Sequence, residues 1–159
     1  MSEPRWLEDD ESAAWFALVS LIVRLPAVLD SQLRRDADLN HFEYQVLAIL
    51  SMSPGHSLRM SRLADLTDGS LSRLSHTVRR LEERGWVQRT PDADDRRSVT
   101  ATLTDEGMRK VEETAPGHVA EVRDRVFDPL TGEQVAQLRE IATAIVSGID
   151  PEWREPFPT

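Results

Sequence analysis

The sequence contains no cysteine, and this absence excludes several kinds of chemistry at once. Disulfide bonds, thiolate zinc sites, cysteine nucleophiles and thiol-based redox sensing all require that residue. Neither a glycine-rich phosphate loop nor a nucleophile elbow is present. We therefore expect no metal, no cofactor and no enzymatic activity. The histidines, which lack the short spacing of a local metal site, are His41, His56, His76 and His118.

Long apolar runs are also missing from the sequence. The apolar stretch Leu18–Val23 is soon interrupted by Arg24 and Pro26, well short of the roughly 18 residues that a membrane span needs. The acidic N-terminal sequence MSEPRWLEDDESAAW lacks the features of a signal peptide. These patterns predict a cytoplasmic protein that makes no membrane contact.

Positive charge is scarce overall but is gathered in one segment. The chain of 159 residues has a formal net charge of −9. Between Ser57 and Thr104 nine arginines stand against seven acidic residues, a net charge of +2, whereas the remainder has ten basic and 21 acidic residues, a net charge of −11. Because a local basic patch is what binds nucleic-acid phosphates, this segment is a candidate DNA-binding surface.

Apolar residues at three- and four-residue steps predict a mainly α-helical, single-domain chain. A first helix is expected over residues 12–35, bent at Pro26. The next should begin after Asn40, with Glu43 completing a capping box. A later helix is expected to kink or break at Pro116–Gly117. The remaining expected helix caps are Ser57, Ser70, Thr104 and Thr131.

The two short helices after Ser57 and Ser70 form a predicted helix-turn-helix, the second helix ending at Gly85. In such units the second helix enters the major groove, and its N-terminal side chains meet base edges. Arg73 could then donate two hydrogen bonds to a guanine. An ordinary amphipathic helix with a solvated basic face is the alternative. The candidate contacts are Ser70, Ser72, Arg73, Ser75, His76 and Arg80, and the expected inner stripe is Leu71, Leu74, Val78 and Leu81.

Strand-forming residues at 86–89 and 98–103 flank a turn at 91–95, the pattern of a two-stranded β-wing. With this wing the chain resembles the MarR family (multiple antibiotic resistance regulators) of dimeric winged helix-turn-helix transcription factors. The run RLEERGWVQRTPDADDRRSVTATLTDEG carries the resemblance, which is strong over 57–107 and weak over 15–149. Within it Asp95-Arg96-Arg97 matches the family's Asp-x-Arg signature, and Leu103-Thr104 closes the second wing strand.

The resemblance implies roles for individual wing residues. Arg97 would reach into the minor groove from the wing tip, with its orientation held by Asp95. Arg96, Arg89 and Arg59 would meet phosphates. His76 stands where many family members have Arg or Lys, which would make the charge at that position depend on pH.

The resemblance also implies an assembly and a function. Residues 12–35 and 104–150 would form the dimerisation helices of a single domain over 1–159, and residues 40–104 the winged-helix DNA-binding region. The expected protein is a homodimeric repressor that binds double-stranded DNA at a roughly palindromic operator. Two other classes stay open: a winged-helix module that binds protein without sequence-specific DNA binding, and an enzyme, which would show turnover and a polar catalytic pocket.

In the family, small aromatic or phenolic ligands bind between the dimerisation helices and the winged-helix DNA-binding region. The matching candidates for a ligand that releases the DNA are Trp15, His41 and Tyr44, with Phe16 and Phe42 beside them. The alternative is that these aromatic residues belong to the core, which is the commoner role of aromatics at helical spacing.

Overall fold

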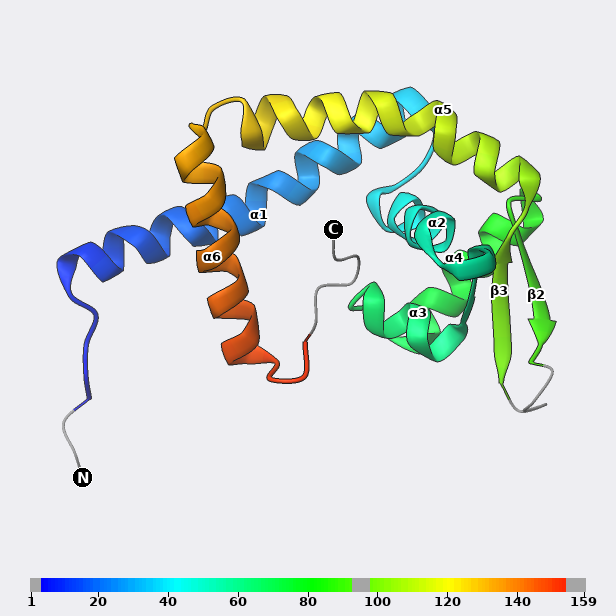
Figure 1. Ribbon diagram of the computed structural model, residues 1–159, viewed down its shortest axis with the longest axis horizontal. Coiled ribbons are helices and arrows are strands. Elements are labelled where there is room, and N and C mark those ends of the chain that lie inside the picture. Colours follow the sequence, from blue (N-terminus) through cyan, green and yellow to red (C-terminus); the bar gives the residue numbers. More distant parts are fainter. Residues whose placement is uncertain (1–3, 93–97, 154–159) are drawn as a thin grey trace.

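The computed structural model describes residues 4–92 and 98–153 and shows a long helical arch joined to a small head (Figure 1). The arch is formed by α1 and α5, which lie side by side, and α6 turns away from the end of α5. The elements are α1 (Asp9–Ala37), α2 (His41–Met52), β1 (Ser57–Arg59), α3 (Met60–Leu66), α4 (Leu71–Glu83), β2 (Val87–Pro91), β3 (Val99–Leu103), α5 (Asp105–Val122) and α6 (Gly132–Ile149).

The mainly helical architecture and the helix-turn-helix are confirmed, and so are most of the predicted helix starts. Around α2, the Asn40 side chain accepts a hydrogen bond from the Glu43 backbone N–H at 2.8 Å, and the Glu43 carboxylate accepts one from the Asn40 backbone N–H at 2.9 Å. A cap of this kind is worth about 1 kcal/mol. Ser70, Thr104 and Thr131 cap α4, α5 and α6 by accepting a hydrogen bond from the backbone N–H three residues on, and at Thr131 the Gln134 side chain completes a capping box.

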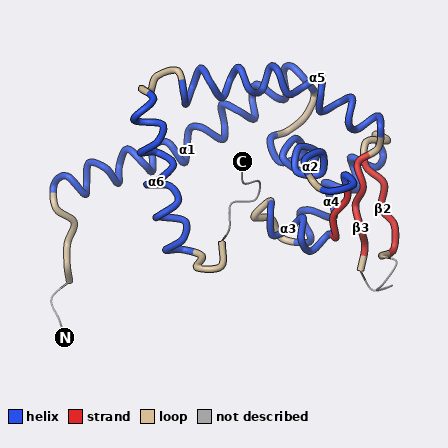
Figure 2. Tube along the Cα trace, in the orientation of Figure 1, coloured by secondary structure: helices blue, strands red, loops and turns tan. Residues whose placement is uncertain are grey.

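The predicted start of the third helix at Ser57 is wrong. Residues Ser57–Arg59 form a strand that pairs antiparallel with β3, with Ser57 opposite Thr102, and α3 begins only at Met60. The two facing hydroxyls lie 2.8 Å apart. The sheet therefore has three strands in the order β1-β3-β2, shown in red in Figure 2, and not two. Residues 57–59 form a strand because they pair with a segment more than 40 residues away. Local sequence patterns do not reveal such a partner.

The predicted kink or break at Pro116–Gly117 is not a break, because the helix is continuous through these residues. α5 runs from Asp105 through Pro116 to Val122, and α1 likewise continues through Pro26. A proline inside a helix removes one backbone hydrogen bond. Next to Pro116, the His118 ring lies 3.2 Å from the Gln32 amide oxygen on α1, so tertiary contact supports α5 at this point.

The core lies in the head and is centred on α2. It is closed by the last turns of α1, by α3 and α4, and by one face of the sheet. Gly107, at the start of α5, fits closely against the segment between α4 and β2, because a Cβ there would lie 2.1 Å from the Trp86 carbonyl oxygen. The fully buried side chains include Leu33, Leu39, Val46, Leu47, Leu50, Leu63, Leu74, Val78 and Leu81.

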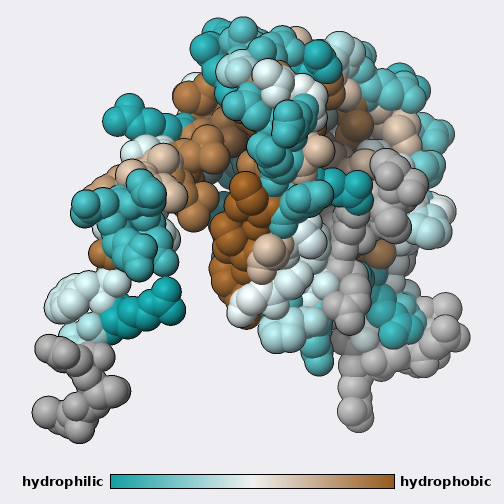
Figure 3. Space-filling view, turned by 60° about the vertical axis from the view of Figure 1, so that its left-hand side comes forward, coloured by the Kyte–Doolittle hydropathy of each residue, from teal (hydrophilic) through white to brown (hydrophobic). Residues whose placement is uncertain are grey.

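The first half of α1 and the whole of α6 are left uncovered. α6 has no buried residue along its 18 positions, although isolated helices depend on packing for most of their stability. Figure 3 shows hydrophobic side chains gathered on the left and in the centre of this view. The exposed large apolar residues of these helices include Trp15, Phe16, Leu21, Ile22, Val23, Ile141, Ile145 and Ile149.

By length and composition α1 could cross a membrane, with a mean hydropathy of 1.9 over an 18-residue window. Arg24 interrupts the apolar run, whereas an average over 18 residues tolerates a single charge of this kind. Core helices of soluble proteins pass the same test, so the property describes an apolar helix and does not identify what surrounds it.

Candidate nucleic-acid interface

A tight turn sets the angle between α3 and α4. Thr67 ends α3 and donates its hydroxyl hydrogen to the Leu63 carbonyl at 2.8 Å, and Asp68 takes a left-handed backbone conformation with φ of 48°. A Cβ at Gly69 would lie 2.8 Å from the Phe42 ring, so this position accepts no side chain without a shift of that ring. The turn is thereby seated on the start of α2.

The solvent-facing side of α4 is polar and basic. Ser72, His76 and Arg79 are exposed, and their spacing of four and three residues places them on one face of the helix. Arg79 makes only a loose ion pair with Glu83, at 3.8 Å. Sequence reasoning missed Arg79, although its spacing from Ser72 and His76 was a sufficient signal.

A second face of α4 carries three arginines that already contact protein. The Arg73 guanidinium lies 4.0 Å from the centre of the Phe42 ring, which is a cation–π geometry. An Arg80 nitrogen lies 2.9 Å from Glu43 Oε1. Arg84 pairs with the Asp38 carboxylate and also donates to the Asp38 carbonyl at 2.8 Å. These arginines fix α4 against the corner between α1 and α2.

Glu43 is the buried member of this corner, with only 2% of its side chain exposed. Its Oε2 accepts the capping hydrogen bond from Asn40, while Oε1 has no well-aligned hydrogen bond among the described residues. The Arg80 guanidinium is close enough to compensate the charge but is poorly angled for a hydrogen bond. Arg80 therefore neutralises a buried carboxylate.

Two further arginines brace the sheet of the wing. Arg89 donates from Nη2 and Nε to Glu82 Oε2 at 2.6 and 2.9 Å, and these bonds lower the pKa of Glu82. Arg59 donates to both carboxylate oxygens of Asp92 at 2.8 and 3.2 Å. Arg89 ties β2 to α4, and Arg59 ties β1 to the end of β2. Acidic partners therefore position both side chains beside α4, the second helix of the helix-turn-helix and hence the proposed reading helix.

The predicted wing-tip residues Asp95, Arg96 and Arg97 lie outside the described residues. On either side of them, the Asp92 backbone N–H donates to the Ser98 carbonyl at 2.9 Å, which closes the base of the wing.

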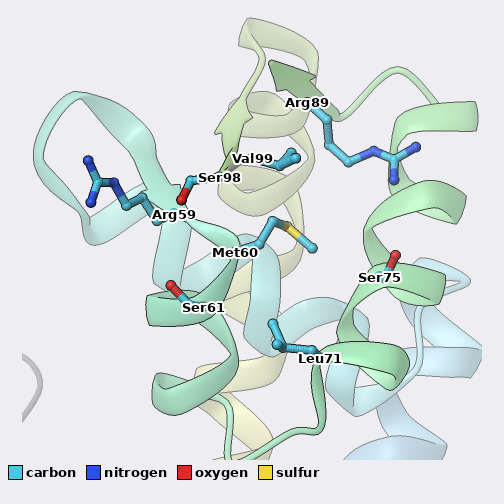
Figure 4. Close-up of a pocket in the computed structure, with 8 residues that line it drawn as sticks. All are labelled: Arg59, Met60, Ser61, Leu71, Ser75, Arg89, Ser98 and Val99. Atoms are coloured by element: carbon cyan, nitrogen blue, oxygen red, sulfur yellow. The ribbon is translucent and has the colours of Figure 1, made fainter. Parts of the chain in front are cut away.

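A hollow of about 330 Å³ separates α4 from the wing (Figure 4). The predicted place of Leu71 on the inner stripe of α4 is wrong, because this side chain is 58% exposed and borders the hollow. Leu71 is the first residue of α4 and lies before the part of the helix that packs against the core, where Leu74 is buried. The lining residues are Arg59, Met60, Ser61, Leu71, Ser75, Arg89, Ser98 and Val99.

The three ligand candidates are not brought together within one chain. Tyr44 is buried and His41 half-buried, but Trp15 is mostly exposed and lies about 22 Å along α1 from Asp30, which accepts a hydrogen bond from the His41 N–H. His118 of α5, which the sequence did not single out, has its ring centre 4.6 Å from that of Tyr44.

Burial governs the ionisation of this aromatic cluster. It lowers the pKa of His41 against the opposing influence of Asp30, and it lowers the pKa of His118, to which the charge of His41 adds. Burial also raises the pKa of the Tyr44 phenol. All three side chains therefore favour their neutral forms, which is consistent with both a core and a ligand-contacting role.

Comparison with known proteins gives consistent matches. The MarR family model matches residues 37–98. Sco3205, a MarR family transcriptional regulator from Streptomyces coelicolor solved in complex with DNA, is 44% identical, with 96% of this chain and 95% of that chain covered and a TM-score of 0.90. AbsC, a MarR family regulator from the same organism, is 35% identical, with coverage of 94% and 100% and a TM-score of 0.87.

Among curated proteins, the HTH-type transcriptional regulator PecS of Dickeya dadantii (strain 3937) is 32% identical over 100 residues. This match covers 62% of the present chain and 60% of PecS, so the chain spans less than two thirds of that relative.

Proposed function

Because the chain belongs to the MarR family, we propose that it is a DNA-binding transcription regulator, a homodimeric repressor of a roughly palindromic operator. The observation that carries this proposal is the exposed face of α4. From Leu71 to Arg80 the helix contains no acidic residue, whereas the whole chain has a net charge of −9. Such a face attracts phosphates and leaves serines, histidine and arginine free to meet base edges.

The proposed contacts follow from the two sides of the hollow. Ser70, Ser72, Ser75 and His76 remain the candidates for the major groove, and Arg79 joins them. Arg59 and Arg89, each oriented by an acidic partner, are candidates for phosphate contacts. Arg73 and Arg80 would act at the edge of this face, because Phe42 and Glu43 hold them there. Asp95, Arg96 and Arg97 keep the wing-tip role that the family resemblance implies.

The uncovered helices support the homodimer. The apolar surface belongs to both α1 and α6, and Figure 1 shows that α6 runs across the direction of α1. A second copy of the chain presents the same two helices in return, so the two copies can cover each other's apolar surfaces. Residues 12–35 and 104–150 would thus form the dimerisation region and residues 40–104 the DNA-binding region. A dimer of this kind acts on DNA in the cytoplasm.

Release by a small aromatic ligand is the finer part of the proposal. His41, Tyr44 and His118 come from α2 and α5, and Gln32 of α1 contacts His118, so the cluster lies where the head meets the arch. A ligand that bound better to one separation of the two heads would shift the dimer towards that separation. Within one chain Trp15 lies too far from this cluster to join such a site, so only the Trp15 of the second copy in the dimer could contribute to it.

Selection of bound DNA from a random duplex pool tests the proposal directly. An enriched inverted repeat whose binding weakens with salt is the expected result, because phosphate contacts release counterions. The alternative of a protein-binding winged helix predicts no salt-dependent duplex binding. Occlusion of RNA polymerase from a promoter that carries the selected site would then separate repression from mere binding.

A further inference from the structure

Leu71 is an apolar side chain displayed on the face proposed for DNA. It occupies the first helical position of α4, directly after the cap Ser70, and is more than half exposed. Figure 4 shows Leu71, Met60 and Val99 around the same hollow, with Ser75 on the neighbouring turn of α4. Leu71 and Ser75 are four residues apart and therefore share one side of the helix.

The position of Leu71 separates it from the other exposed apolar residues. Those of α1, α5 and α6 belong to the surface proposed for the dimer, whereas Leu71, Val99 and Met52 belong to the head, and of these three only Leu71 and Val99 line the hollow. The core does not account for Leu71 either, because Leu74, Val78 and Leu81 fill the inner side of α4. An exposed apolar cluster bordered by polar residues marks a binding surface.

The surroundings of the cluster fit the edge of a base. Arg59 and Arg89 border the hollow, and Ser61 and Ser75 offer hydroxyls beside its apolar part. The thymine 5-methyl is the apolar group that B-DNA presents in the major groove, next to the polar atoms of the base edges. Side chains at the start of a reading helix are the ones that reach those edges.

We propose that Leu71, supported by Met60 and Val99, receives the 5-methyl group of one thymine in each operator half-site. Leu71 would then be a specificity-determining residue, favouring thymine over cytosine at that position by apolar contact. Ser75 would bind a polar atom of the same or the adjacent base. This assignment rests on the proposed DNA-binding function and adds a base preference to it.

Uracil substitution tests the contact on the DNA side. In the most enriched duplex from the random pool, each thymine is replaced in turn by deoxyuridine, which lacks only the methyl group. Wild-type protein should lose about fourfold in affinity per half-site at one position, the effect of one buried methyl-sized group. Leu71→Ala should bind the thymine duplex more weakly and show no further loss with deoxyuridine at that position. Leu71→Met should keep the sensitivity.

Met52→Ala provides the matched control, since Met52 is an exposed apolar residue of the head outside this hollow. It should bind both duplexes like wild type. Thermal unfolding of each variant shows whether the fold is retained. The proposal is overturned if deoxyuridine affects no position, or if it weakens wild type and Leu71→Ala equally, because the double-mutant cycle then gives no coupling. Failure to enrich any duplex would instead overturn the DNA-binding function itself.

Discussion

The Arg80 guanidinium lies 2.9 Å from Oε1 of Glu43, so an exposed arginine of the reading helix neutralises a buried carboxylate at the start of α2. Each of the two residues also has a role in its own helix. Glu43 caps α2 through its other oxygen, and Arg80 belongs to the basic side of α4. The ion pair therefore helps to fix the orientation of α4 relative to α2.

Arg80→Ala should lower the free energy of unfolding by about 1–3 kcal/mol, because it leaves the Glu43 carboxylate buried without its cation. The lower part of that range is expected, since the Arg80 side chain is 60% exposed and water screens the pair. Urea unfolding measures the change. The double variant Glu43→Gln/Arg80→Ala should recover part of the loss, because no buried charge remains.

Arg79→Ala is the matched control in this experiment. It removes the neighbouring arginine of the same helix, whose ion pair is loose and exposed, and should change stability by less than about 0.5 kcal/mol. Equal destabilisation by Arg79→Ala and Arg80→Ala would contradict a special role for the Glu43 pair.

Arg79→Ala, which should hardly change stability, should have a clear effect on DNA binding. Arg79 has no close acidic partner at hydrogen-bonding distance among the described residues and faces solvent beside Ser72 and His76. Arg79→Ala should weaken duplex binding without loss of stability and, if it removes one phosphate contact, reduce the salt slope by about one. Titrations at several salt concentrations check both effects. Arg109→Ala, an exposed arginine of α5, should bind as wild type does.

Local signals in the sequence were enough for the helix starts and for the reading helix. The Asn40–Glu43 capping box and the caps at Ser70 and Thr104 involve residues three apart, so a short window contains both partners. The same spacing rule predicts Arg79, which lies one turn beyond His76 on the solvent-facing side of α4.

Contacts between distant segments could not be predicted in this way. Ser57 forms a strand because Thr102 pairs with it, and Arg73 is held by Phe42 from another helix. Leu71 fits the apolar spacing of α4 but falls before the part of the helix that the core covers. In each case the deciding partner lies tens of residues away, or the deciding feature is the boundary of the core.

Stability should decrease as the pH falls from neutral. Burial lowers the pKa values of His41 and His118 below their usual value of 6.5, so the unfolded chain binds protons more readily than the folded chain. Their contribution to stability is complete above pH 6.5 and is lost as the pH falls from 6.5 towards the lowered folded-state pKa values. Asp30 and Glu121 oppose this shift, but desolvation is the larger influence.

Urea unfolding at pH 7.5 and 5.5 measures this dependence. His118→Gln should flatten the decline, because glutamine does not titrate and can still meet Gln32. His76→Gln, on the exposed face of α4, should leave the slope as in wild type. A decline that is identical in wild type and in the double variant His41→Gln/His118→Gln would place the titrating groups elsewhere, for example among the carboxylates.

The apolar side of α6 gives the strongest test of the dimer. Ile145 is exposed within one chain, so Ile145→Glu places no charge in the core of the head and should leave its fold intact. In a dimer, however, the carboxylate would be buried at the interface, which costs several kcal/mol and should yield a monomer. Loss of simultaneous contact with both half-sites should then weaken operator binding by about 100-fold or more.

Ser147→Glu adds the same charge to the opposite, polar side of α6 and should remain a dimer with wild-type affinity. Sedimentation at micromolar concentration distinguishes the two variants, and far-ultraviolet circular dichroism checks that both are folded. Wild-type protein that sediments as a monomer would leave the exposed stripes of α1 and α6 without a second copy to cover them. Since α6 has no buried residue of its own, binding of these stripes to another protein or to a membrane would then have to stabilise the helix.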